Sequence, residues 1–358
     1  VLLVACLNLG SCKQDTNDKK SATTQSYEIV RGKTMGTTYS IQHDLLSQSL
    51  KTTIDSILID INLSLSTYID SSTISKINNV DNCQEVNILV QGKPSTTCLI
   101  ESVIDSHFLI NYNAASKIFT ETGRSFDPTV MPLVNYWGFG YTEKKAITKV
   151  DSQKVSALKD IVGLDKWTLK TYRENFKVIK PLEAQIDFSA IAKGYAVDYL
   201  SEFLDKKGSK NFIVEIGGEV YAKGNNARNK AWTIGLNTPK ENARVNESIQ
   251  FVTLDNLGLA SSGNYRNFYE VDGHKYGHEI NPKTGYPEKN VLLGVSVIAP
   301  DCMTADAYAT GFMVMGLDKT KVLVEQLSDV EACLFYANEN EELQTQFSSG
   351  FQQFIKES

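Results

Sequence analysis

Apolar residues recur along most of the chain in two patterns, alternation with polar residues and spacing by three or four. Alternation predicts a strand, because successive side chains of a strand point to opposite faces, whereas spacing by three or four predicts one face of a helix. We predict strands over 27–32, 39–42, 167–169, 176–179, 212–216, 232–236, 251–254 and 294–299, and a hairpin over 86–94. We predict helices over 54–65, 99–112, 155–161, 191–204 and 303–313, the last of them capped by Thr304.

These helices and strands follow one another without a regular β-α-β period. A regular period would favour a parallel sheet, so the irregular order favours the α+β class. Two prolines and two glycines among aromatic residues at 126–140 predict an ordered irregular segment.

The stretch Asp187–Tyr195 leads from a strand into a helix, and we place it at the centre of the chain's organisation. We predict that Ser189 caps the helix, because a serine hydroxyl accepts a hydrogen bond from a free backbone N–H. The turn gathers free N–H groups, the positive end of the helix and the ammonium of Lys193, which together favour a phosphate. An ordinary packing turn is the alternative.

Composition limits the class of protein. The chain has 358 residues, of which 42% are hydrophobic, so it can form a large core in one or two domains. Its formal net charge of −6 argues against general nucleic-acid binding, and no nucleic acid is expected as a partner. The chain has no GxGxxG or P-loop pattern, so a nucleotide would not be held in the Rossmann or Walker manner.

The first residues have a different character. Residues 1–11 are mostly apolar and end in Gly10 and Ser11 before Cys12, which resembles the end of a bacterial signal peptide with its lipobox. Cys12 would then carry the lipid, including palmitate. Residues 12–26 would form a flexible polar tether, and residues 27–358 would form the folded domain. A buried N-terminal strand is the alternative.

Cys83 and Cys98 flank the predicted hairpin. In an exported protein they can form a disulfide, and two free thiols are the alternative.

Asp306 and Thr310 are four residues apart in a predicted helix, so they share one face. A carboxylate and a hydroxyl offer hard oxygens to Mg²⁺, which fills the rest of its shell with waters and substrate phosphates. A backbone carbonyl of the turn at 187–193 can supply a third ligand. A hydrogen-bonded helix start explains the same pair without a metal.

His278 lies in a polar, glycine-flanked segment, and histidine is suited to proton transfer near neutral pH. A surface histidine is the alternative, and we expect His43, His107 and His274 to lie at the surface.

Two further residues are open to two interpretations. Tyr68 can stack on a planar ligand, or it can belong to the core. Glu219, after Gly217 and Gly218, can bind a ligand or close a turn.

Taken together, the short motifs resemble the ApbE family, the bacterial FAD:protein FMN transferases. The resemblance extends from about Lys33 to about Gly316. It rests on 35–37 (MGT), 66–68 (STY), 126–129 (FDPT), 137–140 (WGFG), 187–194 (DFSAIAKG), 215–219 (EIGGE), 262–266 (SGNYR), 278–285 (HEINPKTG), and Ala305 and Asp306 with Thr310. Asn281 stands where many members have an aspartate, so an acidic role at that position is in doubt.

The resemblance implies an α+β fold of two intimately packed α/β subdomains with FAD between them. It implies Mg²⁺ bound by the Ala190 carbonyl, Asp306 and Thr310, together with the FAD pyrophosphate. It implies that His278, Lys193 and Asp306 are catalytic. The residues that it implies for FAD are Met35, Tyr68, Ser125, Phe126, Asp127, Asp187, Lys193 and Ile280.

The activity that the resemblance implies is Mg²⁺-dependent transfer of the FMN part of FAD to a threonine or serine hydroxyl of an acceptor flavoprotein, with release of AMP. The acceptors of the family are subunits of membrane redox complexes, such as the Na⁺-pumping quinone reductase and the Rnf complex. Two alternatives remain, a Mg²⁺-dependent FAD diphosphatase and a non-catalytic FAD-binding lipoprotein. We expect the protein in the bacterial cell envelope, anchored to a membrane by its lipid on the periplasmic side.

Overall fold

The computed structural model describes residues 26–45, 49–90, 93–102, 104–140, 150–172, 175–237, 248–263, 268–271, 274–277, 279–288 and 291–356. The predicted signal remnant, Cys12 and the tether up to residue 25 lie outside the described residues, and so does His278.

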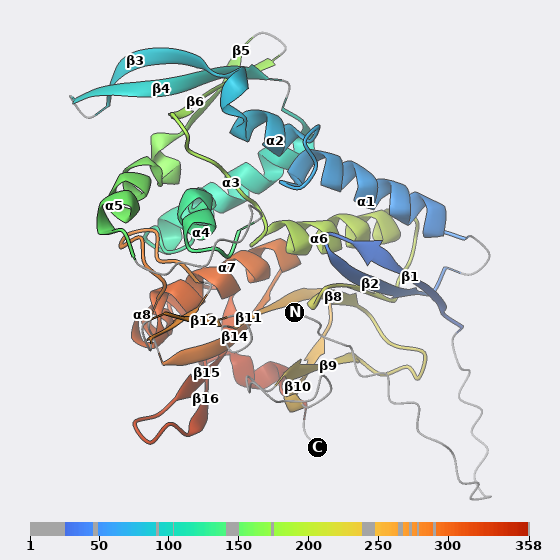
Figure 1. Cartoon of the computed structure of the whole chain (residues 1–358). Helices are drawn as coiled ribbons and strands as arrows, with labels where there is room; N and C mark the ends of the chain where they lie inside the picture. Colours follow the sequence, from blue (N-terminus) through green and yellow to red (C-terminus); the bar gives the residue numbers. More distant parts are fainter. Residues whose placement is uncertain are drawn as a thin grey trace, which may run out of the picture.

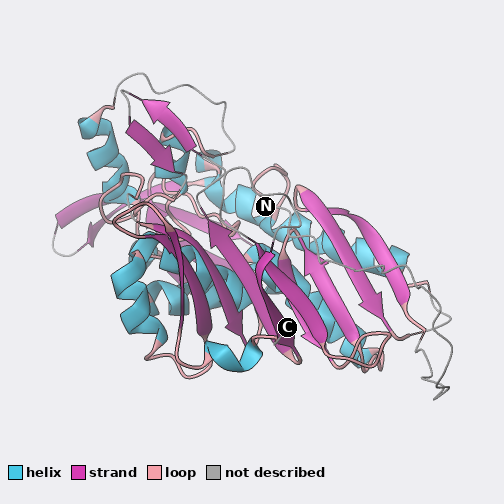
Figure 2. Cartoon of the chain, turned by 90° about the horizontal axis from the view of Figure 1, so that it is seen from below, coloured by secondary structure: helices cyan, strands magenta, loops and turns pink. Residues whose placement is uncertain are grey.

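The centre of the fold is an eight-stranded sheet with the strand order β1-β2-β7-β8-β11-β14-β15-β16 (Figure 2). Every neighbouring pair in it is antiparallel. This arrangement, with helices packed against the sheet, confirms the predicted α+β class. The strands span Glu28–Thr34 (β1), Thr37–His43 (β2), Phe212–Ile216 (β7), Glu219–Lys223 (β8), Leu257–Gly263 (β11), Leu292–Ala299 (β14), Glu331–Ala337 (β15) and Leu343–Phe347 (β16).

The two faces of the large sheet bury two different cores. On β7, Phe212 and Val214 join the core beneath the helices, whereas Ile213 between them joins the core on the opposite face. Strand alternation therefore sorts the side chains into two layers. Helices α6 (Ala192–Lys206) and α7 (Cys302–Met315) cover the first face, and the two-stranded sheet of β9 (Trp232–Asn237) and β10 (Ser248–Leu254) covers the second (Figure 1).

A second, four-stranded sheet lies beyond the helix layer (Figure 1). Its order is β3-β4-β6-β5, and Cys83, just before β3, forms a disulfide with Cys98 of β4 with a Cα–Cα distance of 5.2 Å. The strands span Gln84–Val90 (β3), Lys93–Ser102 (β4), Thr168–Tyr172 (β5) and Asn175–Pro181 (β6), and a separate pair spans Phe268–Val271 (β12) and His274–Gly277 (β13).

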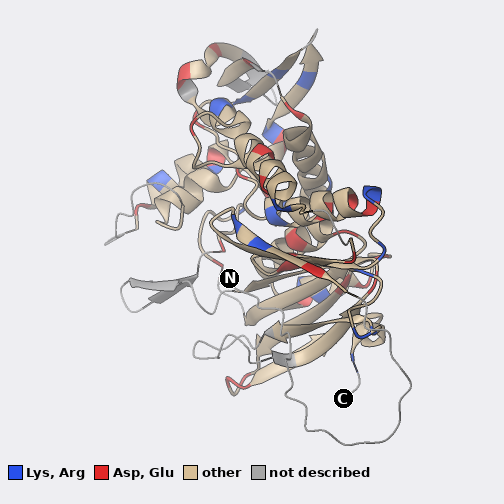
Figure 3. Cartoon of the chain, turned by 90° about the vertical axis from the view of Figure 1, so that its right-hand side faces the viewer, with Lys and Arg blue, Asp and Glu red and all other residues tan. Residues whose placement is uncertain are grey.

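The remaining helices span Lys51–Leu65 (α1), Thr73–Asn78 (α2), Ser106–Glu121 (α3), Met131–Tyr136 (α4), Ser152–Ile161 (α5) and Leu317–Val324 (α8), with 3-10 turns at Val80–Asn82, Leu164–Lys166 and Phe351–Phe354. Among them, α1, α3, α5 and α8 carry both basic and acidic residues, and Figure 3 shows where the charged residues lie along the chain. None of the helices within the described ranges is long and apolar enough to cross a membrane.

The predicted helix over 99–112 is wrong in its first half. Residues Leu99 and Ile100 belong to β4, where they pair with Ile179 and Val178 of β6. The helix α3 begins only at Ser106, because the Asp105 carboxylate accepts a hydrogen bond from the N–H of Phe108 at 2.9 Å and caps it.

Both predicted helix caps are also wrong. Helix α7 begins at Cys302, and its cap is Asp301, whose carboxylate accepts a hydrogen bond from the N–H of Thr304 at 2.7 Å. Helix α6 begins at Ala192 and has no side-chain cap. Ser189 instead donates its hydroxyl to Asp187 at 2.8 Å.

Candidate active site

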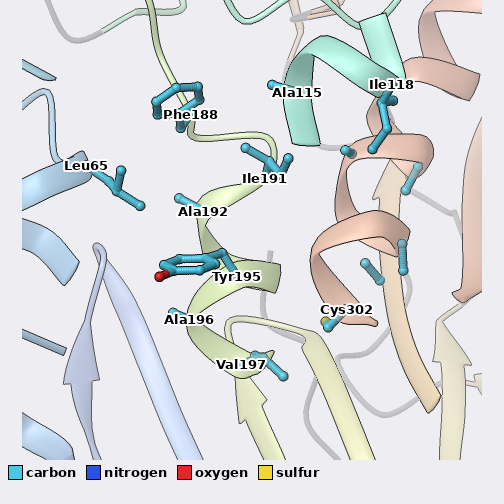
Figure 4. Packing of buried hydrophobic residues seen from close by; sticks show 14 of the residues in the cluster. Leu65, Ala115, Ile118, Phe188, Ile191, Ala192, Tyr195, Ala196, Val197 and Cys302 are labelled. Atoms are coloured by element: carbon cyan, nitrogen blue, oxygen red, sulfur yellow. The ribbon is translucent and has the colours of Figure 1, made fainter. Parts of the chain in front are cut away.

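Helices α6 and α7 meet where the predicted phosphate turn enters α6 (Figure 4). The backbone N–H of Gly194 donates a hydrogen bond to Oδ2 of Asp306 at 3.0 Å. The contact is close, since a Cβ atom at Gly194 would lie 2.4 Å from the carbonyl oxygen of Cys302. Only glycine therefore allows α6 to approach the start of α7 so closely.

Asp306 supplies an acceptor at the start of α6. Gly194 is the third residue of this helix, so its N–H is one of the helix-start donors that have no acceptor within the helix. Here that N–H serves Asp306, and the Ala190 carbonyl accepts no hydrogen bond from any residue that the structure describes. A carbonyl oxygen is thus available just before α6, and Asp306, which contacts the first turn of this helix, is only 4% exposed.

The oxygens gathered here fit a hard cation. Thr310 lies one turn after Asp306 on α7, and its hydroxyl is 3.3 Å from the hydroxyl of Ser262. A carboxylate, a carbonyl and a hydroxyl are donors that Mg²⁺ accepts. No group of three His, Cys, Asp or Glu side chains within the described ranges would hold a metal, so a cation here needs the carbonyl and oxygens of a ligand.

Lys193 forms an ion pair with Glu219 of β8. The Glu219 side chain is 3% exposed and the Lys193 side chain 28% exposed, so the ion pair is largely shielded from solvent. Burial acts to lower the pKa of Lys193, but the carboxylates of Asp306 and Glu219 outweigh it and raise that pKa. Lys193 is therefore a fixed positive charge at neutral pH.

Asp187 joins the turn to the segment at 125–129. Its backbone N–H donates to the carbonyl of Pro128 at 2.8 Å, and its carboxylate accepts from the N–H of Ser189 at 3.0 Å. Burial raises the pKa of Asp187, and the two hydrogen bonds from Ser189 oppose that rise. The predicted FAD residues Asp187 and Ser125–Asp127 are thus brought side by side.

The Ser125–Asp127 segment is buried and rigid. The Asp127 carboxylate accepts from the N–H and the hydroxyl of Thr129, at 2.9 and 2.6 Å, and Phe126 is 2% exposed. Burial raises the pKa of Asp127 to about 6. The hydroxyl of Ser125 lies 3.4 Å from Nζ of Lys283.

A cavity of about 360 Å³ opens beside Asp127. Four basic residues and two acidic residues line it, so its charge is positive and suits an anionic ligand. The lining residues are Arg124, Asp127, Lys159, Asp160, Val162, Lys166, Pro282 and Lys283.

Ile280 and Asn281 precede Lys283 on the same loop. Ile280 is buried with Leu133 and Trp137 in a small apolar core, so its side chain serves packing. The Asn281 side chain accepts from the N–H of Lys283 at 2.9 Å and donates to Glu288 at 2.8 Å. An aspartate cannot donate in this way, and the observed role of Asn281 is to close the turn.

Met35 and Tyr68 complete the predicted FAD residues. Met35 lies in the turn between β1 and β2 with a φ of +47°. The adjacent Thr38 carbonyl accepts from the N–H of Gly217 at 3.1 Å, which places this turn beside the β7–β8 turn that leads to Glu219. Tyr68 is 79% exposed, contrary to its interpretation as a core residue.

The expectation of surface histidines is wrong for two of them. His43 is 0% exposed and His107 is 5% exposed, and a ring nitrogen of His107 lies 2.6 Å from the Tyr195 hydroxyl. The sequence leaves Glu219 open between ligand binding and turn closure, and it does not predict the ion pair with Lys193. The only signal for this pair is that both residues belong to motifs on which the resemblance to the ApbE family rests.

Comparison with known proteins identifies the family. The chain matches the ApbE family over residues 35–334. It is 35% identical to the FAD:protein FMN transferase of Haemophilus influenzae over 334 residues, which cover 91% of this chain and 89% of that protein. It is 34% identical to the FAD:protein FMN transferase of Vibrio cholerae over 300 residues, 82% of this chain and 83% of that protein.

Solved structures agree with this relationship. The flavin transferase ApbE from Vibrio cholerae is similar with a TM-score of 0.78 and 30% identity, over 92% of this chain and 99% of that one. The ApbE protein from Thermotoga maritima is similar with a TM-score of 0.76 and 26% identity, over 93% of this chain and 100% of that one. This chain belongs to the ApbE family.

Proposed function

We propose that this protein transfers the FMN part of FAD to a threonine or serine hydroxyl of an acceptor flavoprotein and releases AMP. Its relatives from Haemophilus influenzae and Vibrio cholerae carry the name of this activity. The observation that supports it most is the first turn of α6, where the open Ala190 carbonyl, the Asp306 carboxylate and the Lys193 ammonium converge.

The reaction breaks the phosphoanhydride bond of FAD and forms one phosphoester bond to the acceptor. The acceptor oxygen bonds to the FMN-side phosphorus, the bond from that phosphorus to the bridging oxygen breaks, and AMP leaves with the electron pair. The hydroxyl proton goes to a base, for which His278 is our candidate. Negative charge builds on the phosphoryl oxygens, and Lys193 offsets it as a fixed cation.

Ala190, Asp306 and Thr310 are the residues that would hold Mg²⁺. When bound, this ion would neutralise charge on the pyrophosphate and on the departing AMP. Met35, Tyr68, Ser125–Asp127 and Asp187 would hold the flavin nucleotide. Ile280, whose side chain is buried in an apolar core, would contact it through its backbone.

Hydrolysis and storage of FAD are the rival activities. One incubation with FAD, Mg²⁺ and an acceptor domain separates the three. Transfer gives an acceptor band with flavin fluorescence in a denaturing gel. A diphosphatase gives AMP and free FMN without that band, and intact FAD after long incubation indicates storage.

We also propose that Cys12 carries a lipid that anchors the protein to a membrane of the bacterial cell envelope, on the periplasmic side. There it would meet acceptor subunits of membrane redox complexes, of the Na⁺-pumping quinone reductase or Rnf type. Labelling of growing cells with palmitate tests the anchor. The protein should take up the label, Cys12→Ser should not, and equal labelling of both would contradict the anchor.

A further inference from the structure

Glu219 has one carboxylate oxygen that the described fold does not use. Oε1 bonds to Nζ of Lys193, whereas Oε2 is buried and accepts no hydrogen bond from any residue within the described ranges. A buried carboxylate oxygen without a partner costs free energy, because it loses its hydrogen bonds to water and gains none. Such an oxygen needs an explanation, for which an ion, a bound water or a ligand is suited.

The backbone holds Glu219 firmly. It is the first residue of β8, directly after Gly217 and Gly218, whose φ values of +64° and +115° form a tight two-residue turn. Its backbone pairs with Ile216 where β7 and β8, two inner strands of the large sheet, meet at this turn, and the residue is 2% exposed. The free oxygen therefore belongs to a buried side chain on an inner strand of the sheet.

The surroundings of Glu219 are the candidate cation site. Its partner Lys193 directly precedes Gly194, whose N–H donates to Asp306. The open carbonyl of Ala190 lies three residues before Lys193. Through its bond to Lys193, Glu219 is therefore tied to the same first turn of α6 that contacts Asp306.

We propose that Glu219 is a positioning residue, which fixes the Lys193 ammonium through Oε1 and accepts through Oε2 a hydrogen bond from a water of the cation shell. This inference rests on the proposed function, since the cation is expected to arrive with FAD. Mg²⁺ keeps several of its waters when it binds to protein and phosphate oxygens. One of these waters would donate the hydrogen bond that Oε2 of Glu219 lacks. Outer-shell acceptors of this kind orient the shell and contribute to metal affinity.

Glu215 provides a matched control. It lies in the same hairpin, is 8% exposed, and uses its carboxylate to accept the N–H of Gly218 at 2.9 Å. Burial raises the pKa of Glu215 as well, to about 7. Glu215→Gln therefore makes the same chemical change in the same turn and leaves Lys193 in its ion pair.

The test measures binding of Mn²⁺ to the full chain in the presence of FAD and without an acceptor, from the electron paramagnetic resonance signal of free Mn²⁺. We expect Glu219→Gln to weaken Mn²⁺ binding about 10- to 100-fold and Glu215→Gln to leave it near the wild-type value. Equal Mn²⁺ affinity of the two variants would overturn the inference and leave the proposed function standing. Absence of Mn²⁺ binding to the wild-type protein with FAD would overturn the proposed cation site itself, and the inference with it.

If Glu219→Gln does not fold, as judged by circular dichroism, Glu219→Asp decides the question. It keeps the charge but shortens the side chain by one methylene, so it withdraws both oxygens from their positions. We expect weaker Mn²⁺ binding than in the wild type, and wild-type affinity of Glu219→Asp would contradict the positioning role.

Discussion

The backbone N–H of Gly194 donates to the carboxylate of Asp306 across the interface of α6 and α7. One carboxylate thereby joins two helices and satisfies a backbone donor at the start of α6. The stability of the helix pair and the chemistry of the candidate site depend on the same contact.

We predict that Gly194→Ala destabilises the protein by about 1–3 kcal/mol through overpacking. The new Cβ would lie 2.4 Å from the backbone carbonyl oxygen of Cys302, and backbone cannot move aside easily. Gly311→Ala is the control within α7, because its Cβ would meet side-chain atoms of Thr122 and Phe126 at 3.0 and 3.2 Å. Urea unfolding measures both, and equal stability of the two variants would contradict the close-packing account.

We predict that Asp306→Ala abolishes Mg²⁺-dependent turnover of FAD. Asp306→Asn separates the two roles of the side chain, because an amide oxygen can still accept the N–H of Gly194 but carries no charge. We expect Asp306→Asn to unfold at nearly the wild-type urea concentration and to lose turnover. Retained activity in either variant would refute the assignment of Asp306 as a cation ligand.

We predict that His278→Ala binds FAD nearly as well as the wild type and transfers FMN much more slowly. Removal of a general base typically lowers the rate 10²- to 10⁴-fold, on the order of 3–5 kcal/mol of barrier. Quenching of flavin fluorescence measures binding, and acceptor labelling measures transfer. An undiminished transfer rate would exclude His278 as the base.

Asp198 makes stability depend on pH. Its carboxylate accepts from the N–H groups of Cys302 and Met303, at 2.8 and 2.7 Å, and burial raises its pKa from 3.8 to about 8, with a further rise from Asp301. Between pH 4 and 8 the unfolded chain loses this proton while the folded protein keeps it, so the free energy of unfolding falls as pH rises.

We therefore predict that Asp198→Asn flattens this fall. The asparagine resembles the protonated aspartate, so the free energy of unfolding of the variant should be close to that of the wild type at pH 5. At pH 8 the variant should have the higher free energy of unfolding of the two. Other buried acids titrate in both proteins and cancel in the difference. Urea unfolding at the two pH values checks this, and an identical pH dependence of the two proteins would contradict it.

The sequence predicted four of the eight strands of the large sheet, β1, β2, β7 and β14, and missed β8, β11, β15 and β16. The strand at 212–216 is recognisable because both of its faces are buried, which makes it an almost continuous apolar run. The prediction failed at Leu99 and Ile100, where apolar spacing fits a helix and a strand equally. Pairing with β6, which lies some 80 residues later in the chain, decides for the strand. A single sequence carries no information on that pairing.

The candidate site was predictable only in part, for a similar reason. Asp306 and Thr310 share a helix face, so spacing alone brings them together. The bond from Gly194 to Asp306 joins residues 112 apart, and the ion pair from Lys193 to Glu219 joins residues 26 apart on different elements. Neither follows from local pattern, and Ser189 was misassigned as a cap because Asp187, two residues earlier, binds its hydroxyl instead.

The most direct test of the account is the stoichiometry of products with FAD, Mg²⁺ and an acceptor domain. We predict that the acceptor gains the mass of FMN less one water and that one AMP appears for each acceptor labelled. Asp306→Asn should give neither product. Release of AMP with free FMN and an acceptor of unchanged mass would contradict transfer.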